Sequence, residues 1–154
     1  MGVADLLPPR GVVAHLRVTN KKQALQELAK RAALLTGIPD RRIYEILAER
    51  ERLGSTGIGR GIAVPHGKLP ELAGLCGVFA RLDRPIPFDA VDDKPVDLAF
   101  CLLAPTNAGA EHLRALALVS RLLRDPAVCQ KLRGTENSDA LYALLTDRTE
   151  SNAA

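Results

Sequence analysis

Hydrophobic residues along the chain follow two spacings, and each spacing predicts a different kind of element. Apolar positions three or four residues apart are typical of amphipathic helices, whereas short continuous apolar runs are typical of buried strands. The run at 96–103 is the most continuously apolar and is therefore predicted to be a central strand. The predicted helices cover 21–35, 39–52, 107–124, 126–132 and 138–145, and the predicted strands cover 12–18, 62–64, 75–82 and 96–103.

Capping and chain-breaking residues mark where these elements begin and end. Gly37 is expected to end the first helix, and Pro105 is expected to stop the last strand. Prolines and aspartates make 84–95 a predicted loop. Glu51, near the end of the second helix, falls on the predicted polar side of that helix. The candidate N-caps are Thr19 or Asn20 for the first helix and Thr106 or Asn107 for the third.

Strands interleaved with helices predict an α/β fold, in which a mixed central sheet is covered by helices on both faces. The length of 154 residues fits one domain over 1–154. We expect an ordered core over 6–146 and a frayed C-terminal tail after it. The sequence has no visible internal repeat.

Composition narrows the classes of function. Hydrophobic residues make up 47% and charged residues 25% of the chain, which is ordinary for a soluble globular protein. Aromatic residues make up only 3%, with no Trp, and the 21 basic and 18 acidic residues are interspersed. We therefore expect no nucleic-acid partner. The N-terminus does not resemble a signal peptide, and no apolar stretch approaches the roughly 20 residues that span a bilayer, so we expect no membrane insertion and a cytoplasmic protein.

The three cysteines, Cys76, Cys101 and Cys129, are far apart and have apolar neighbours. They contain no C-x-x-C pair, so we expect buried, unreactive thiols rather than disulfides or a zinc site. The histidines also lack the spacing of metal ligands, and we expect no metal and no cofactor. His15 lies in an apolar, strand-like context without a recognisable partner and is interpreted as structural.

The segment LGSTGIGRGIAVPHG, from Leu53 to Gly67, is the strongest candidate for chemistry. It lacks the Lys and Ser or Thr that a P-loop needs after its second glycine, and the third glycine of a dinucleotide-binding fingerprint. Ser55 is not framed by the G-x-S-x-G pattern of serine hydrolases. What remains is His66, which follows the stiff backbone of Pro65.

A neutral imidazole is a good nucleophile towards phosphorus near neutral pH. A phosphorylated His66 would need hydrogen-bond donors, which the hydroxyls of Ser55 and Thr56, glycine N–H groups and an arginine could supply. Alternatively, His66 is an ordinary surface or packed residue and the glycines serve only as turns. The candidate glycines of such a phosphate cradle are Gly54, Gly57, Gly59, Gly61 and Gly67.

His112 is the second candidate for chemistry. It falls in the first turns of the predicted helix that ends at Arg124. From this position it could hydrogen-bond a phosphoryl group or hold the tautomer of His66. The alternative is a histidine on the helix surface with no part in chemistry.

Three blocks of the sequence resemble the nitrogen-regulatory IIA proteins of the bacterial phosphotransferase system. The first block is RERLGSTGIGRGIAVPHGKL, at Arg50–Leu69. The second is GVFARLDRPIPFDAVDDKPVDLAFCLLAP, at Gly77–Pro105, and the third is EHLRALALVSRLLRD, at Glu111–Asp125. The fructose and mannitol IIA domains share the fold and part of this pattern, and the LGSTGIG form favours the regulatory branch.

The resemblance implies that His66 accepts a phosphoryl group on Nε2 from a phosphorylated histidine of an HPr-like carrier protein. It implies supporting roles for Arg50 and His112, and it matches Ser55 and Thr56 to a serine and a threonine of the family. The family chemistry requires no metal.

The resemblance also bears on the surface around His66. Arg60 stands where relatives often have a small polar residue, so an extra cation could lie near the donor interface. An exposed phosphoryl-accepting histidine implies a shallow apolar docking surface. The candidates for its rim are Ile58, Ile62 and Leu69.

The expected function is that of a phosphoryl carrier that regulates partner proteins, such as transporters or sensor kinases, according to its phosphorylation state. One alternative is a stand-alone sugar-specific IIA component that passes phosphate to a IIB domain. Another is a non-catalytic module that binds an anion or a protein. The sequence leaves the oligomeric state open, with a weak homodimer as one option.

Overall fold

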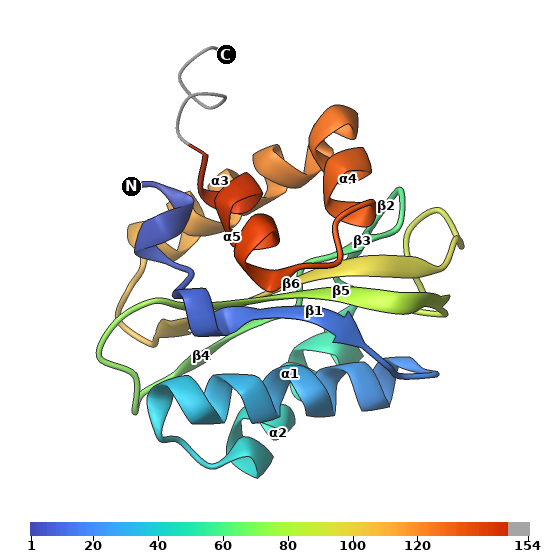
Figure 1. The fold of residues 1–154 in the computed structure, drawn as a ribbon. Helices are drawn as coiled ribbons and strands as arrows, with labels where there is room; N and C mark the ends of the chain where they lie inside the picture. Colours follow the sequence, from blue (N-terminus) through green and yellow to red (C-terminus); the bar gives the residue numbers. More distant parts are fainter. Residues whose placement is uncertain (148–154) are drawn as a thin grey trace.

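A computed structural model describes residues 1–147, which fold into a six-stranded mixed sheet between two layers of helices (Figure 1). This arrangement confirms the predicted α/β fold with helices on both faces. The tail that is expected to be frayed lies, from residue 148 onward, outside the described residues. The strands are β1 (Val12–Leu16), β2 (Gly57–Gly59), β3 (Ile62–Ala63), β4 (His66–Leu69), β5 (Cys76–Ile86) and β6 (Val96–Pro105).

The strand order is β1-β5-β6-β3-β2, and β4 also pairs with β6. β5 runs antiparallel to β6, whereas β3 and β4 both run parallel to it. β6 therefore has neighbours along both edges, and nine of its ten residues are buried. The prediction of a central strand from its continuous apolar run is confirmed.

Helices α1 (Lys21–Thr36) and α2 (Asp40–Leu53) cover one face of the sheet. Helices α3 (Ala110–Arg124), α4 (Pro126–Arg133) and α5 (Ser138–Thr146) cover the other (Figure 1). Two short 3-10 turns, η1 (Val3–Asp5) and η2 (Pro9–Gly11), precede β1. Asn20 caps α1 by accepting a hydrogen bond from the Gln23 N–H, and Gly37 ends it with a φ of 78°, as predicted.

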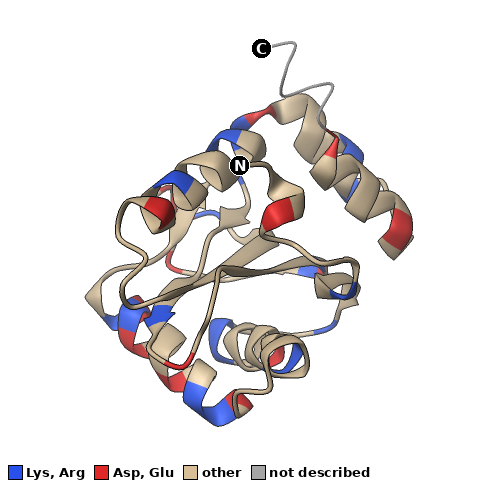
Figure 2. Ribbon diagram, turned by 90° about the vertical axis from the view of Figure 1, so that its left-hand side faces the viewer, with Lys and Arg blue, Asp and Glu red and all other residues tan. Residues whose placement is uncertain are grey.

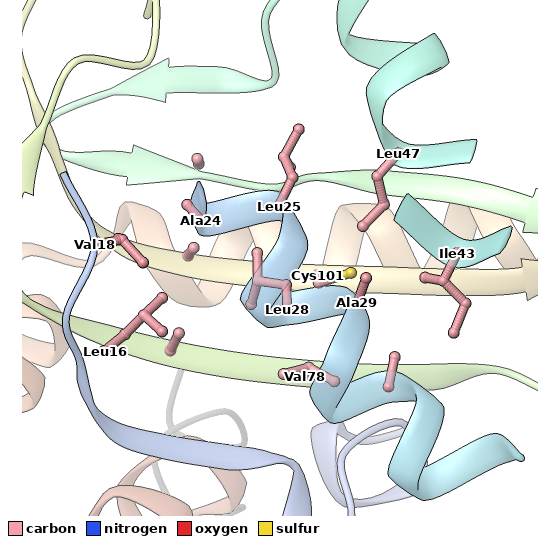
Figure 3. Close-up of a cluster of buried hydrophobic side chains, with 14 of the residues drawn as sticks. Leu16, Val18, Ala24, Leu25, Leu28, Ala29, Ile43, Leu47, Val78 and Cys101 are labelled. Atoms are coloured by element: carbon pink, nitrogen blue, oxygen red, sulfur yellow. The ribbon is translucent and has the colours of Figure 1, made fainter. Parts of the chain in front are cut away.

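The alternation of side chains along the strands builds two hydrophobic cores. Val78 of β5 and Cys101 of β6 are register partners and face α1 and α2, where they join Leu28 and Ile43 (Figure 3). The next pair along, Phe79 and Phe100, points to the opposite face and packs with Ala115, Val119 and Leu123 of α3. Each face of the sheet is thus sealed by its own helix layer.

Three details of the prediction are wrong. β5 continues to Ile86, through part of the predicted 84–95 loop, because Ile86 pairs with Val96 after a break in register that accommodates Pro85. The third helix starts at Ala110 after Gly109, so neither Thr106 nor Asn107 caps it. Two short strands, β2 and β4, were not predicted, because runs of three and four residues carry too little periodicity.

Charged residues of both signs are intermixed over the outer helices and loops (Figure 2), and a few lie on the strands. Within residues 1–147, no helix has the length and apolar character needed to cross a membrane. The three cysteines are free and buried, as predicted. Burial raises the pKa of the Cys76 thiol to about 11 and also raises the pKa values of Cys101 and Cys129, which favours unreactive thiols.

Candidate functional site

His66 is the first residue of β4 and pairs with Leu102 of β6. Gly67, the next residue, packs against Ile46 of α2. Because side chains alternate along a strand, His66 must point to the opposite face of the sheet, which α3 covers. The imidazole is half-buried, so one side of the ring remains accessible to solvent.

A single hydrogen bond decides the tautomer of His66. Its Nδ1 lies 2.9 Å from the carbonyl oxygen of Val64. A carbonyl oxygen can only accept, so Nδ1 must carry the proton, and in the neutral ring Nε2 holds the lone pair. The Val64 carbonyl, rather than His112, therefore holds the tautomer of His66.

His112 lies in the first turn of α3 and faces His66. The two ring centroids are 5.9 Å apart, with an angle of 76° between the ring planes. His112 is only 5% exposed, so the alternative of a histidine on the helix surface is wrong. Its Nε2 is buried and has no hydrogen-bond partner among the described residues. A buried polar atom without a partner is costly, and such atoms in native proteins commonly mark functional sites.

The charge state of His112 follows from its surroundings. Burial lowers the pKa of its imidazole, and the nearby His66 and Lys68 lower it further. His112 is therefore neutral at neutral pH. Lys68 lies two residues beyond His66 on the same face of β4, which brings a cation close to both rings. Sequence reasoning missed Lys68, although its i+2 spacing from His66 was available as a signal.

Arg50 lies in the last turn of α2, and its Nη1 donates to the carbonyl oxygen of Gly54 at 2.8 Å. This hydrogen bond ties the loop before β2 to the helix. The remaining N–H groups of its guanidinium make no hydrogen bond to other described residues, and so they stay available to an anion. The structure thus shows Arg50 bracing the glycine-rich segment, and the only hydrogen bond of its side chain to a described residue is to Gly54 rather than to His66.

The two predicted hydroxyl donors are both engaged by residues of neighbouring segments. Ser55 Oγ donates to the carbonyl oxygen of Phe88 at 2.7 Å and accepts from the Gly57 N–H at 3.0 Å. The Thr56 hydroxyl donates to the Glu51 carboxylate, and Thr56 is buried. Both side chains therefore hold the shape of the segment that precedes β2.

The candidate cradle glycines do not converge on His66. Gly61 lies beside Asp97 at the start of β6, whereas His66 pairs with Leu102, roughly 17 Å further along that strand at about 3.3 Å per residue. Gly59 and Gly61 have φ values of 102° and 81° and form the β2–β3 turn. A Cβ at Gly67 would come within 2.5 Å of Ile46 Cγ2, so Gly67 is needed for close packing. A cradle that includes Gly59 and Gly61 is not supported by this geometry.

Close packing also explains Gly57, where a Cβ would come within 2.8 Å of Ala90 Cβ. Gly54 lies at the end of α2, and its carbonyl oxygen accepts the hydrogen bond from Arg50. Most glycines of this segment therefore serve turns and close contacts, which was the alternative interpretation from the sequence.

Other predicted features of the site are corrected by the structure. Ile62 is 1% exposed and Leu69 is 0% exposed, so of the three predicted rim residues only Ile58, at 39%, is at the surface. Arg60 is exposed and lies in the β2–β3 turn, away from His66, with a φ of 58°. His15 has a partner after all, because its Nδ1 lies 3.0 Å from Asp83 Oδ1.

The described residues contain no group of three or more His, Cys, Asp or Glu side chains that could hold a metal ion. The site therefore consists of an oriented half-buried imidazole, a buried neutral imidazole beside it, and the nearby cation Lys68. This arrangement suits a nucleophile that receives an anionic group.

The comparison with known families agrees with this geometry. Residues 5–148 match the model of the family "Phosphoenolpyruvate-dependent sugar phosphotransferase system, EIIA 2". The chain belongs to this family. Membership makes the protein a component of a phosphotransferase system, and it confirms the resemblance inferred from the three sequence blocks.

Relatives within the EIIA 2 family include proteins named for nitrogen regulation. A nitrogen regulatory protein of Bradyrhizobium diazoefficiens is 53% identical over 145 residues, which cover 94% of this chain and 95% of that protein. The nitrogen regulatory protein of Escherichia coli is 44% identical over 87% of this chain and 83% of its own length. The crystal structure of the nitrogen regulatory protein IIA-Ntr from Neisseria meningitidis superposes with a TM-score of 0.88 at 33% identity, covering 94% of this chain and 99% of that one.

Proposed function

We propose that this EIIA protein is a phosphoryl carrier that accepts a phosphoryl group on Nε2 of His66 and regulates partner proteins through its phosphorylation state. The observation that carries the proposal is the hydrogen bond from His66 Nδ1–H to the Val64 carbonyl. It leaves the Nε2 lone pair as the nucleophile of a ring whose orientation is already fixed.

The donor is a phosphorylated histidine on an HPr-like carrier protein. The Nε2 lone pair of His66 forms a new bond to phosphorus while the P–N bond of the donor breaks. The electron pair of the broken bond returns to the donor imidazole. His66 keeps its Nδ1 proton throughout, and the Val64 carbonyl stabilises the positive charge that develops on the ring.

Three further groups support this chemistry in the proposal. An Nε2–H of His112 can donate to a phosphoryl oxygen, which would satisfy the buried atom that has no partner in the unphosphorylated protein. Lys68 supplies positive charge on the same face of β4. Arg50 retains donors that suit an anionic oxygen.

The regulatory part of the proposal rests on the relatives, several of which are named nitrogen regulatory proteins at 43–53% identity. The alignments cover 87–94% of this chain and 83–95% of these relatives. We propose that the protein acts in the cytoplasm and that its targets are transporters or sensor kinases, which recognise its phosphorylated and unphosphorylated states differently.

The test is incubation with phosphoenolpyruvate and the general donor proteins of the phosphotransferase system. The wild-type chain should acquire acid-labile, base-stable phosphate, and His66→Ala should acquire none. His15→Gln is the matched control, because His15 lies on the surface beside Asp83, and it should be phosphorylated like the wild type. Phosphate that persists in His66→Ala, or none in the wild type, would refute the proposal.

A sugar-specific role is the second candidate, and one relative favours it. The fructose-specific EIIA component of Haloferax volcanii is 38% identical over 69% of this chain and 69% of its own length. A sugar-specific component would pass its phosphoryl group to a IIB domain. Rapid loss of phosphate from His66 to a purified IIB domain would favour this role, whereas stable phosphorylation in its presence would favour regulation.

A further inference from the structure

A buried ion pair links the start of α1 to the end of α2. Lys21 Nζ lies 2.6 Å from Glu51 Oε2, with side-chain exposures of 21% and 5%. The Lys21 ammonium also lies 4.9 Å from the centre of the Phe88 ring. Burying two charges costs desolvation energy that their attraction seldom exceeds, so such a pair is weak evidence for a purely stabilising role.

Glu51 was predicted on the polar side of α2, yet the structure turns its carboxylate inward onto Thr56. The Thr56 backbone N–H lies 3.2 Å from each carboxylate oxygen, and the Thr56 hydroxyl donates to the same carboxylate. The Lys21 ammonium is a third donor to the same carboxylate. Residues of both α1 and α2 therefore hold the backbone at Thr56 in place.

The contacts continue from Thr56 to the reactive histidine. The Thr56 carbonyl accepts a hydrogen bond from the Val64 N–H at 2.9 Å. The Val64 carbonyl in turn accepts from His66 Nδ1–H at 2.9 Å. An unbroken series of contacts therefore runs from the ion pair to the imidazole, although its members are spread over 46 residues, from Lys21 to His66.

We infer that the Lys21–Glu51 pair is a positioning device for His66. By fixing Thr56, it fixes Val64, and the Val64 carbonyl sets both the tautomer and the orientation of the imidazole. The inference rests on the proposed function, since orientation matters only if His66 Nε2 receives the phosphoryl group. Misplacing a reacting atom by about 1 Å can cost about 100-fold in rate, so a loosened Val64 would slow transfer.

Two variants remove the device in different ways. Glu51→Gln keeps the size of the side chain but removes its charge. The double variant Lys21→Met with Glu51→Leu replaces the whole pair by apolar residues, an exchange that often leaves stability unchanged. The matched control is Glu27→Gln, which breaks the exposed pair between Glu27 and Lys30 on α1.

Two measurements apply to each variant. The first is the ¹⁵N chemical shifts of the His66 imidazole in the unphosphorylated protein, which report the population of the Nδ1–H tautomer without any phosphoryl transfer. The second is the initial rate of phosphoryl uptake from the phosphorylated HPr-like donor, measured over a range of donor concentrations.

We expect both variants to lose Nδ1–H population and to lower the maximal uptake rate about tenfold, with the KM for the donor unchanged. Glu27→Gln should match the wild type in both measurements. Wild-type shifts and rates in a folded variant would overturn the inference, as would failure of both variants to fold, which would assign the pair to stability alone. If the wild type itself takes up no phosphate, the proposed function fails, while the ¹⁵N shifts still test the positioning.

Discussion

Replacement of His112 by phenylalanine should separate activity from stability. The position is buried, and its ring meets His66 edge to face, so Phe conserves most of the packing. What His112→Phe removes is Nε2, a buried atom without a partner in the unphosphorylated protein. The free energy of unfolding should therefore stay unchanged or rise by about 1 kcal/mol.

The same substitution should slow phosphorylation. A hydrogen bond to a charged group contributes about 1.5–3 kcal/mol. If His112 donates to the transferring phosphoryl group, its loss lowers the rate roughly 10- to 150-fold, while His66 can still be phosphorylated slowly.

The assay pairs urea unfolding of the variant with the initial rate of phosphoryl uptake from the phosphorylated donor. His15→Phe, a substitution at an exposed histidine, controls for the general effect of adding an aromatic ring. An unchanged uptake rate in His112→Phe would refute the reasoning. A large loss of stability would also refute it, because Nε2 would then have been satisfied in the native state.

Three further predictions concern the pH dependence of stability, the rate of phosphoryl uptake and the close packing of a glycine. The pKa of His112 is lower in the folded protein than in the unfolded chain, so as the pH falls the unfolded chain takes up this proton before the folded protein does. The free energy of unfolding should therefore fall as the pH drops below about 6.5. Urea unfolding at a series of pH values checks this, and His112→Phe should lack this part of the pH dependence. Arg50→Lys should slow phosphoryl uptake about tenfold, because a point charge cannot reproduce the planar fork; an unchanged rate would remove Arg50 from the site. Gly67→Ala should lower the melting temperature through a clash with Ile46 that costs about 1–3 kcal/mol, whereas Gly74→Ala, which has open space, should not.

Local sequence signals predicted most of the fold. α1 and α4 follow the helical spacing of their apolar residues, and Asn20 and Gly37 set the ends of α1 through contacts within a few residues. The apolar run of β6 marked the central strand. β2 and β4 escaped prediction because such short strands are defined by their pairing with β3 and β6 rather than by their own pattern.

The candidate site was predictable only in its residue types. His66 stood out because it follows a proline and a glycine-rich segment, and the resemblance added His112 and Arg50. The glycines misled because positive φ angles serve tight turns as readily as phosphate binding. Lys68 was overlooked because its relation to His66 depends on β4 being a strand.

The sequence by itself determined the helices, the central strand and the histidine that carries the proposed chemistry, because these depend on residues close together in the chain. Only the tertiary structure decided what surrounds His66. The pairing of β4 with β6 turns the imidazole towards α3, and the Val64 carbonyl selects its tautomer. Glu51 shows why most plainly. From the sequence, an acidic residue at the end of a helix is expected to be solvated, and only the fold brings Lys21 and the Thr56 backbone into contact with its carboxylate.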